Sequence, residues 1–173
     1  MKYLLIDSCI YRAECFKFDK GLLNYISKLC QKNKIRLLYS DIIYKEVLGM
    51  MIEKCIECTH NISSAIKAIN FLNDENMIKD IKNVSKEQLS NLSKAKLDKY
   101  IKQSKASIIE LNIDIQTIID DYFSSNPPFG SGDKKSEFPD AIVLQSLDNK
   151  NFEEFDSIYI LSNDKDGNVK NFV

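Results

Sequence analysis

The chain has 173 residues, of which 44% are apolar and 28% charged, with a formal net charge of −1. These values are ordinary for one globular domain that buries a sizeable core. No apolar run approaches the roughly 18 residues of a membrane span, and the short run 3–6 stops at Asp7. The sequence therefore predicts a cytoplasmic protein with neither a signal peptide nor a membrane helix.

The five cysteines are odd in number and widely spread, so they do not indicate a disulfide framework. Cys55 and Cys58 are the one close pair. A zinc site needs four ligands, and the chain has no second pair and no histidine besides His60. Two cysteines three apart also share one helix face, where they act as small hydrophobes. We favour the core interpretation, with a metal or redox site as the alternative.

The first part of the chain alternates strands and helices. Residues 3–7 predict a short buried strand, and Asp19 predicts the N-cap of a following helix. Residues 35–39 predict a second strand, after which Ser40-Asp41 cap a helix that continues through Glu46 toward residue 58. This alternation indicates an α/β fold with a parallel sheet.

The middle of the chain departs from that pattern. Residues 61–125 show helical spacing without a convincing strand, and we interpret them as an insert of three helices within a single domain of residues 1–173. The prolines and glycines of residues 126–132 end the insert. A helix beginning near Pro139 and a buried strand at 158–161 follow. A final strand is missing after Asp164, so the sequence is either an excerpt of a longer protein or closes its sheet differently.

Charge is unevenly distributed along the chain. Residues 79–105 contain eight lysines and three acids, whereas residues 106–173 contain thirteen acids and five lysines. A basic segment beside an acidic one is typical of a protein that holds a polyanion with the first and a metal ion with the second.

Four carboxylates follow predicted strands or begin predicted helices: Asp7, Glu46, Asp140 and Asp164. A parallel sheet would bring them to one edge, where their repulsion requires a counter-ion. Mg²⁺ and Mn²⁺ prefer such oxygen ligands and assist phosphodiester hydrolysis. Each acid taken alone is also explained as a helix cap, and Glu46 carries the weakest signal because Glu is common on exposed helix faces.

Several of these segments resemble PIN-domain nucleases. They are Leu5-Ile6-Asp7-Ser8, Glu46 on the second helix, Glu137-Phe138-Pro139-Asp140-Ala141 and Leu161-Ser162-Asn163-Asp164-Lys165-Asp166. The run Lys134 to Ala141 is similar to that of a bacterial PIN-like subgroup with a helical insert. The resemblance spans residues 3–166 and covers the insert loosely.

The resemblance implies a three-layer α/β/α fold and metal-dependent hydrolysis of RNA. Asp7, Glu46, Asp140 and Asp164 would form the acidic quartet that holds Mg²⁺ or Mn²⁺. Ser162 would support Asp164 or a metal-bound water, and Ser8 would orient Asp7 or contact phosphate. Two further acids, Glu137 and Asp166, would be accessory. The protein would then be an endoribonuclease, such as a toxin or defence effector restrained by an inhibitory protein or a further domain.

Lys134 and Lys135 precede the acidic helix and could hold an RNA phosphate, whereas the lysines at 96, 99, 102 and 105 are interpreted as a solvated helix face. Two other functions stay open. A phosphatase would use Asp7 as a nucleophile, but such sites commonly have a second Asp where this chain has Cys9. A nucleic-acid-binding or scaffolding module would use the acids as caps only. The sequence leaves the oligomeric state undecided.

Overall fold

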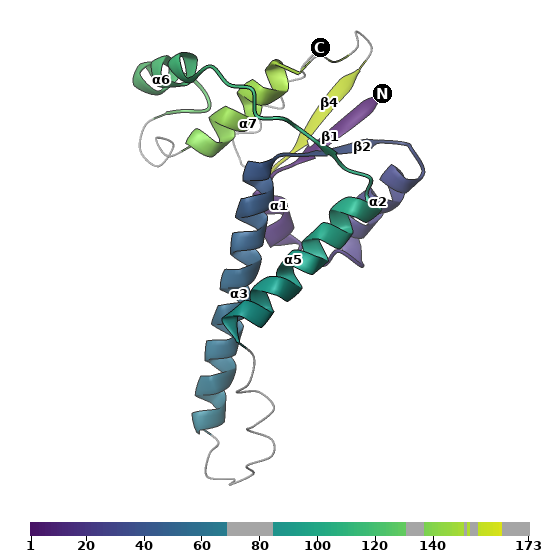
Figure 1. Ribbon diagram of the computed structural model, residues 1–173, viewed down its shortest axis with the longest axis vertical. Helices are drawn as coiled ribbons and strands as arrows, with labels where there is room; N and C mark the ends of the chain where they lie inside the picture. The colour runs from purple at the N-terminus through teal and green to yellow at the C-terminus, as the bar shows by residue number, and fades with distance from the viewer. Residues whose placement is uncertain (69–84, 131–136, 151, 153–155, 164–173) are drawn as a thin grey trace.

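The computed structural model describes residues 1–68, 85–130, 137–150, 152 and 156–163. Within these residues the chain forms four strands and six helices, labelled in Figure 1. No helix in this part of the chain is long and apolar enough to cross a membrane. The elements, in chain order, are β1 (Lys2–Ile6), α1 (Ser8–Ala13), α2 (Gly21–Gln31), β2 (Arg36–Tyr39), α3 (Asp41–Ala68), α5 (Lys86–Gln103), β3 (Ser107–Ile108), α6 (Ile115–Ser124), α7 (Phe138–Asp148) and β4 (Ser157–Leu161).

The four strands form one parallel sheet in the order β3-β2-β1-β4. β1 is paired on both edges, and its Leu5 and Ile6 are buried, as expected of a strand in the middle of a parallel sheet. Leu5 pairs with Leu38 of β2, and Ile6 pairs with Leu161 of β4. This register brings the carboxyl ends of β1, β2 and β4 to the same edge of the sheet.

The connections place helices on both faces of the sheet. From β1 the chain passes through β2 to β3 and then returns to β4, on the other side of β1. Because connections between parallel strands are almost always right-handed, this reversal puts α6 and α7 on the face opposite α2, α3 and α5, as Figure 1 shows. The predicted three-layer α/β/α fold is therefore confirmed.

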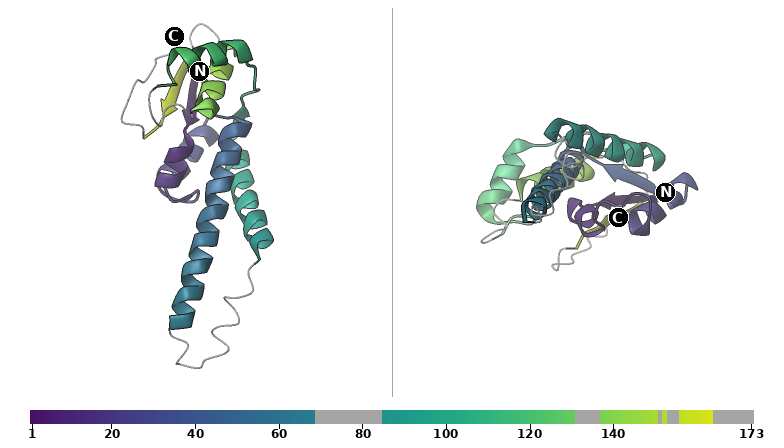
Figure 2. Two further views of the ribbon diagram at one scale, coloured as in Figure 1. Left: turned by 90° about the vertical axis from the view of Figure 1, so that its left-hand side faces the viewer. Right: turned by 90° about the horizontal axis from the view of Figure 1, so that it is seen from below.

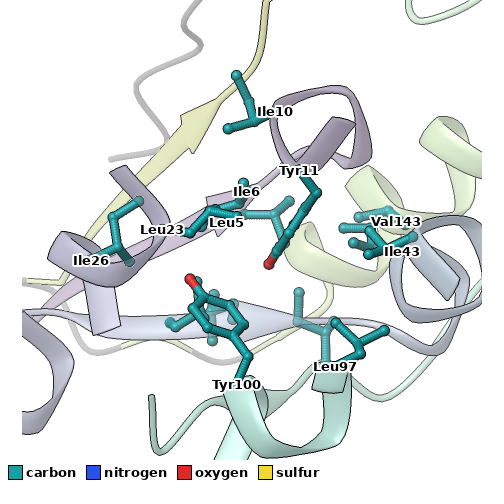
Figure 3. Packing of buried hydrophobic residues seen from close by; sticks show 14 of the residues in the cluster. Leu5, Ile6, Ile10, Tyr11, Leu23, Ile26, Ile43, Leu97, Tyr100 and Val143 are labelled. Carbon is teal, nitrogen blue, oxygen red and sulfur yellow. The ribbon is translucent and has the colours of Figure 1, made fainter. Parts of the chain in front are cut away.

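The main core joins β1 and β2 to the surrounding helices. Leu23 of α2 and Val47 of α3 are among its fully buried members, and Val143 and Leu147 bring α7 into the same cluster. Tyr11 of α1 and Tyr100 of α5 meet in its interior with ring centroids 6.1 Å apart (Figure 3). Burying large aromatic rings contributes much of the apolar area that stabilises a domain of this size.

A second, smaller cluster fixes α7 against α6. Ile118 of α6, Phe129 and Ala141 of α7 are buried together. The Tyr122 ring lies 5.5 Å from that of Phe129 and 5.0 Å from that of Phe138, at the start of α7. This aromatic packing fixes the amino end of α7, where Asp140 lies.

Helices α3 and α5 run side by side, and the carboxyl-terminal part of α3 extends well beyond the sheet (Figure 2). Tyr44 of α3 donates a hydrogen bond to Asp98 of α5 at 2.7 Å, and Lys94 forms an ion pair with the same carboxylate. Lys94 and Tyr44 together lower the pKa of Asp98. The lysines at positions 96, 99, 102 and 105 are exposed, which agrees with the predicted solvated face.

The structure corrects several predicted elements. Helix α1 was not predicted, because it has only six residues after its N-cap, Asp7. Asp19 is not the N-cap of α2, since the helix begins at Gly21 after Lys20, with no side-chain cap. The predicted helix starting near Ile62 is instead the continuation of α3, which is unbroken to Ala68.

The predicted insert also contains a strand, contrary to expectation. Ser107–Ile108 form β3, a two-residue strand parallel to β2. Periodicity cannot reveal so short a strand. Helix α5 ends at Gln103, before the predicted end near Ile108, and Lys105 just after it has a left-handed backbone conformation. Helix α6 begins after Asp114 as predicted.

The core interpretation of the cysteine pair is wrong for Cys58, which is exposed. Cys55 is half-buried, and its sulfur lies 4.0 Å from the Ser93 hydroxyl of α5. The two positions differ because α3 leaves the sheet at this point, so only one side of the helix still has a neighbour.

Candidate active site at the carboxyl edge of the sheet

Asp7 is the residue around which the candidate site is built. It follows β1 directly, and its extended backbone makes it the N-cap of α1. The Asp7 backbone N–H donates to the carbonyl of Leu161 at 3.0 Å, which continues the pairing of β1 with β4 by one more bond. The next residue along β4, Ser162, therefore lies beside Asp7 at the sheet edge where ligands bind in open α/β folds.

Three donors hold the half-buried Asp7 carboxylate in place. The Ser162 hydroxyl donates to Oδ2 at 2.6 Å, and the Cys9 thiol donates to the same oxygen at 3.1 Å. The Cys9 backbone N–H donates to Oδ1 at 3.2 Å and caps α1. A carboxylate offers about four lone-pair positions, so these donors leave roughly one for another partner. The arrangement orients Asp7 before any ligand arrives.

Ser162 and Ser8 are the two hydroxyl residues to which the resemblance gives a role. Ser162 donates a hydrogen bond to Asp7, and its predicted support of Asp164, which lies outside the described residues, stays a prediction. The contacts that orient the Asp7 carboxylate come from Cys9 and Ser162, whereas Ser8 is the first residue of α1 and is half-buried. A phosphate contact by Ser8 stays a prediction.

Cys9 was not predicted to be part of the site. Its sulfur also accepts a hydrogen bond from the Asn163 backbone N–H at 3.3 Å and lies 3.6 Å from the Ser162 hydroxyl. Partial burial raises the pKa of the thiol, and Asp7 raises it further, which favours the protonated form that can donate. An Asp at the start of a helix commonly accepts a hydrogen bond from the backbone N–H two residues later, so the bond from the Cys9 N–H to Asp7 is a typical local pattern. No local pattern predicts the bond from the Cys9 thiol to Asp7.

Glu46 and Asp140 come from two helices that flank the sheet. Glu46 is half-buried on α3, whose first turn is capped by Ser40 at the end of β2. Asp140 is exposed in the first turn of α7, beside Pro139, where the positive end of the helix dipole favours a carboxylate. Glu137 is the N-cap of α7 but forms no capping bond through its side chain.

The described acids do not form a complete metal site by themselves. Among residues 1–68, 85–130, 137–150, 152 and 156–163, no group of three or more His, Cys, Asp or Glu side chains could hold a metal ion. Asp164 and Asp166 lie outside this part of the chain, as do Lys134 and Lys135. The oxygen donors of Asp7, Glu46 and Asp140 do fit the preference of Mg²⁺ and Mn²⁺. The four-acid arrangement thus stays a prediction.

Comparison with known protein families gives one match. A family model described as a PIN domain matches residues 4–166, from β1 to beyond Ser162. No curated protein and no solved structure matches the chain significantly. PIN domains are generally metal-dependent nucleases. With a parallel four-stranded sheet and a family match over nearly its whole length, the chain belongs to the PIN-domain family.

Proposed function

We propose that this PIN domain is a metal-dependent endoribonuclease that hydrolyses RNA phosphodiester bonds. The observation that carries the proposal is the Asp7 carboxylate, half-buried at the carboxyl edge of the sheet and held by Ser162 and Cys9. A carboxylate that is already oriented loses little freedom when it engages a cation, which is what a metal-binding acid requires.

The acids of the site would each have a defined task. Asp7 and Asp140, with Asp164 and Glu46, would supply the negative oxygens that hold one or two Mg²⁺ or Mn²⁺ ions. Such ions, when bound, activate water and neutralise charge that develops on the phosphate. Ser162 keeps Oδ2 of Asp7 turned toward β4, which leaves Oδ1 as the oxygen with capacity for a cation.

The remaining predicted residues would act on the substrate and the outer part of the site. Lys134 and Lys135 would hold an RNA phosphate near the acids, since phosphate contacts supply most of the affinity of such proteins. Glu137, the N-cap of α7, lies three residues before Asp140 and would be an accessory acid, as would Asp166. Ser8 would contact phosphate from the start of α1.

The biological setting is part of the same proposal. An RNA-cleaving enzyme in the cytoplasm would act on the cell's own RNA, so a restraint by an inhibitory protein or a further domain is expected. We therefore propose a toxin or defence effector. Self-association is compatible with this role.

The experiment is cleavage of a labelled total-RNA pool by the purified protein in Mn²⁺, in EDTA, and in Mn²⁺ with single variants. Asp7→Asn and Asp140→Asn should abolish cleavage and keep the fold. Glu110→Gln removes an exposed acid between β3 and α6 and should cleave as the unmodified protein does. Cleavage that continues in EDTA or with Asp7→Asn would contradict the proposal.

A second candidate is a nucleic-acid-binding module without catalysis. It is favoured by one observation, the lack of a three-acid metal group among the described residues. RNA binding that is insensitive to EDTA, together with no cleavage in Mn²⁺, would support it. The phosphatase alternative is less favoured, because Cys9 stands where a second acid is expected.

A further inference from the structure

We propose that Cys9 is a positioning residue of the nuclease, in which one thiol fixes both the Asp7 carboxylate and the chain that leaves β4. This inference rests on the proposed function. It concerns a side chain that neither the motif nor the charge pattern singles out as part of the site.

The sulfur of Cys9 contacts both sides of the site. As a donor it bonds Asp7 Oδ2 at 3.1 Å, and as an acceptor it receives the Asn163 backbone N–H at 3.3 Å. A thiol has a weak donor and a weak acceptor, so both functions of the group are used at once. The Ser162 hydroxyl, which donates to the same Asp7 oxygen, lies 3.6 Å from the sulfur.

The bond from the Asn163 N–H to the Cys9 sulfur holds the chain just after the end of β4. The ladder between β1 and β4 ends with the bond from Asp7 N–H to the Leu161 carbonyl. Ser162 and Asn163 lie beyond this ladder and are exposed, so they are held by side chains instead. Asn163 directly precedes Asp164 in the sequence. Cys9 thus ties the acid after β1 to the backbone that leads to the acid after β4.

Substitutions at Cys9 separate this role from simple packing. Cys9→Ala and Cys9→Val remove the donor and the acceptor, and Val keeps most of the volume of the side chain. Cys9→Ser keeps both hydrogen-bonding functions, although its oxygen lies nearer to the backbone than the sulfur does. The matched control is Cys15→Ala, because Cys15 is exposed and its thiol makes only a long approach of 3.9 Å to the Ala13 carbonyl among the described residues.

The first measurement is steady-state RNA cleavage as a function of RNA and Mn²⁺ concentration. For Cys9→Val we expect kcat to fall about tenfold with KM for RNA unchanged, since a hydrogen bond to a charged group is lost near the reacting atoms. The Mn²⁺ concentration that gives half the maximal rate should rise. Cys9→Ser should recover most of kcat, and Cys15→Ala should leave it unchanged. Equal kinetics for the unmodified protein and Cys9→Val would overturn the proposal.

The second measurement needs neither metal nor RNA. Amide hydrogen exchange, resolved by NMR, should show that the Asn163 N–H loses protection in Cys9→Ala and keeps it in Cys9→Ser. Equal protection of Asn163 in both variants would also overturn the proposal. If the unmodified protein does not cleave RNA, the proposed function fails, and this exchange experiment still decides whether Cys9 fixes the end of β4. Comparison of unfolding temperatures separates these effects from a loss of folding.

Discussion

Ser162 Oγ donates a hydrogen bond to Asp7 Oδ2 across 2.6 Å, although the two residues are 155 positions apart in the sequence. The bond joins the residues that directly follow β1 and β4, which are neighbours in the sheet. It therefore links the first and the last described strand at the edge where the candidate site lies. A hydroxyl bonded to a carboxylate is among the stronger hydrogen bonds in proteins.

Removal of this hydroxyl should affect cleavage more than folding. In Ser162→Ala, Asp7 loses its shortest contact, and we expect RNA cleavage in Mn²⁺ to fall about tenfold. Ser162→Thr keeps the hydroxyl and should retain most of the activity. Initial rates for the two variants and the unmodified protein make the comparison. Equal loss in both variants would show that crowding at this position, rather than the hydrogen bond, is responsible.

Ser40 should contribute to stability through the start of α3. It is 0% exposed, and its hydroxyl accepts the Ile43 backbone N–H at 3.2 Å. Ser40→Ala should lower the free energy of unfolding by about 1 to 2 kcal/mol, because the buried N–H loses its partner. Urea denaturation measures the change. Ser64→Ala, at an exposed position within the same helix, should change stability very little; a similar loss there would contradict the capping explanation.

Tyr100 should tolerate loss of its hydroxyl but not of its ring. The side chain is 1% exposed, and its hydroxyl lies near that of Ser104 without a hydrogen-bond partner among the described residues. Tyr100→Phe should therefore leave the free energy of unfolding unchanged or raise it by up to about 1 kcal/mol. Tyr100→Ala should cost about 3 to 5 kcal/mol because it opens a cavity among Tyr11, Phe18 and Leu97. Thermal unfolding of both variants tests this; marked destabilisation by Phe would show that the hydroxyl is bonded.

Alkaline pH should destabilise the fold through two buried tyrosines. Burial raises the pKa of Tyr11 and of Tyr100 in the folded protein. A raised pKa gives stability that is complete below the unfolded value of about 10 and is lost as pH rises above it. Phenolate absorbance should show two of the eight tyrosines ionising only when the protein unfolds. A double Tyr11→Phe and Tyr100→Phe variant should lose this delayed phase; ionisation of all eight with one normal midpoint would refute the prediction.

The local sequence determined most of the fold. Apolar runs at residues 3–7, 35–39 and 158–161 predicted three of the four strands, because a strand covered on both faces needs side chains that are apolar throughout. The alternation with helices indicated the parallel sheet and its α/β class. The patterns failed for short or continuous elements: the six-residue α1, the two-residue β3 and the uninterrupted α3. In these cases pairing and packing with distant residues outweighed local preference.

The sequence alone also placed Asp7 and Ser162 at strand ends, and the resemblance assigned both to a nuclease site. Only the tertiary structure decided that they bond to each other and that Cys9 joins them, because the register of β1 against β4 brings Leu161 beside Ile6. Side-chain periodicity reports which face of a strand is buried, whereas contacts across strand ends depend on register. Register is set by the whole sheet and its covering helices.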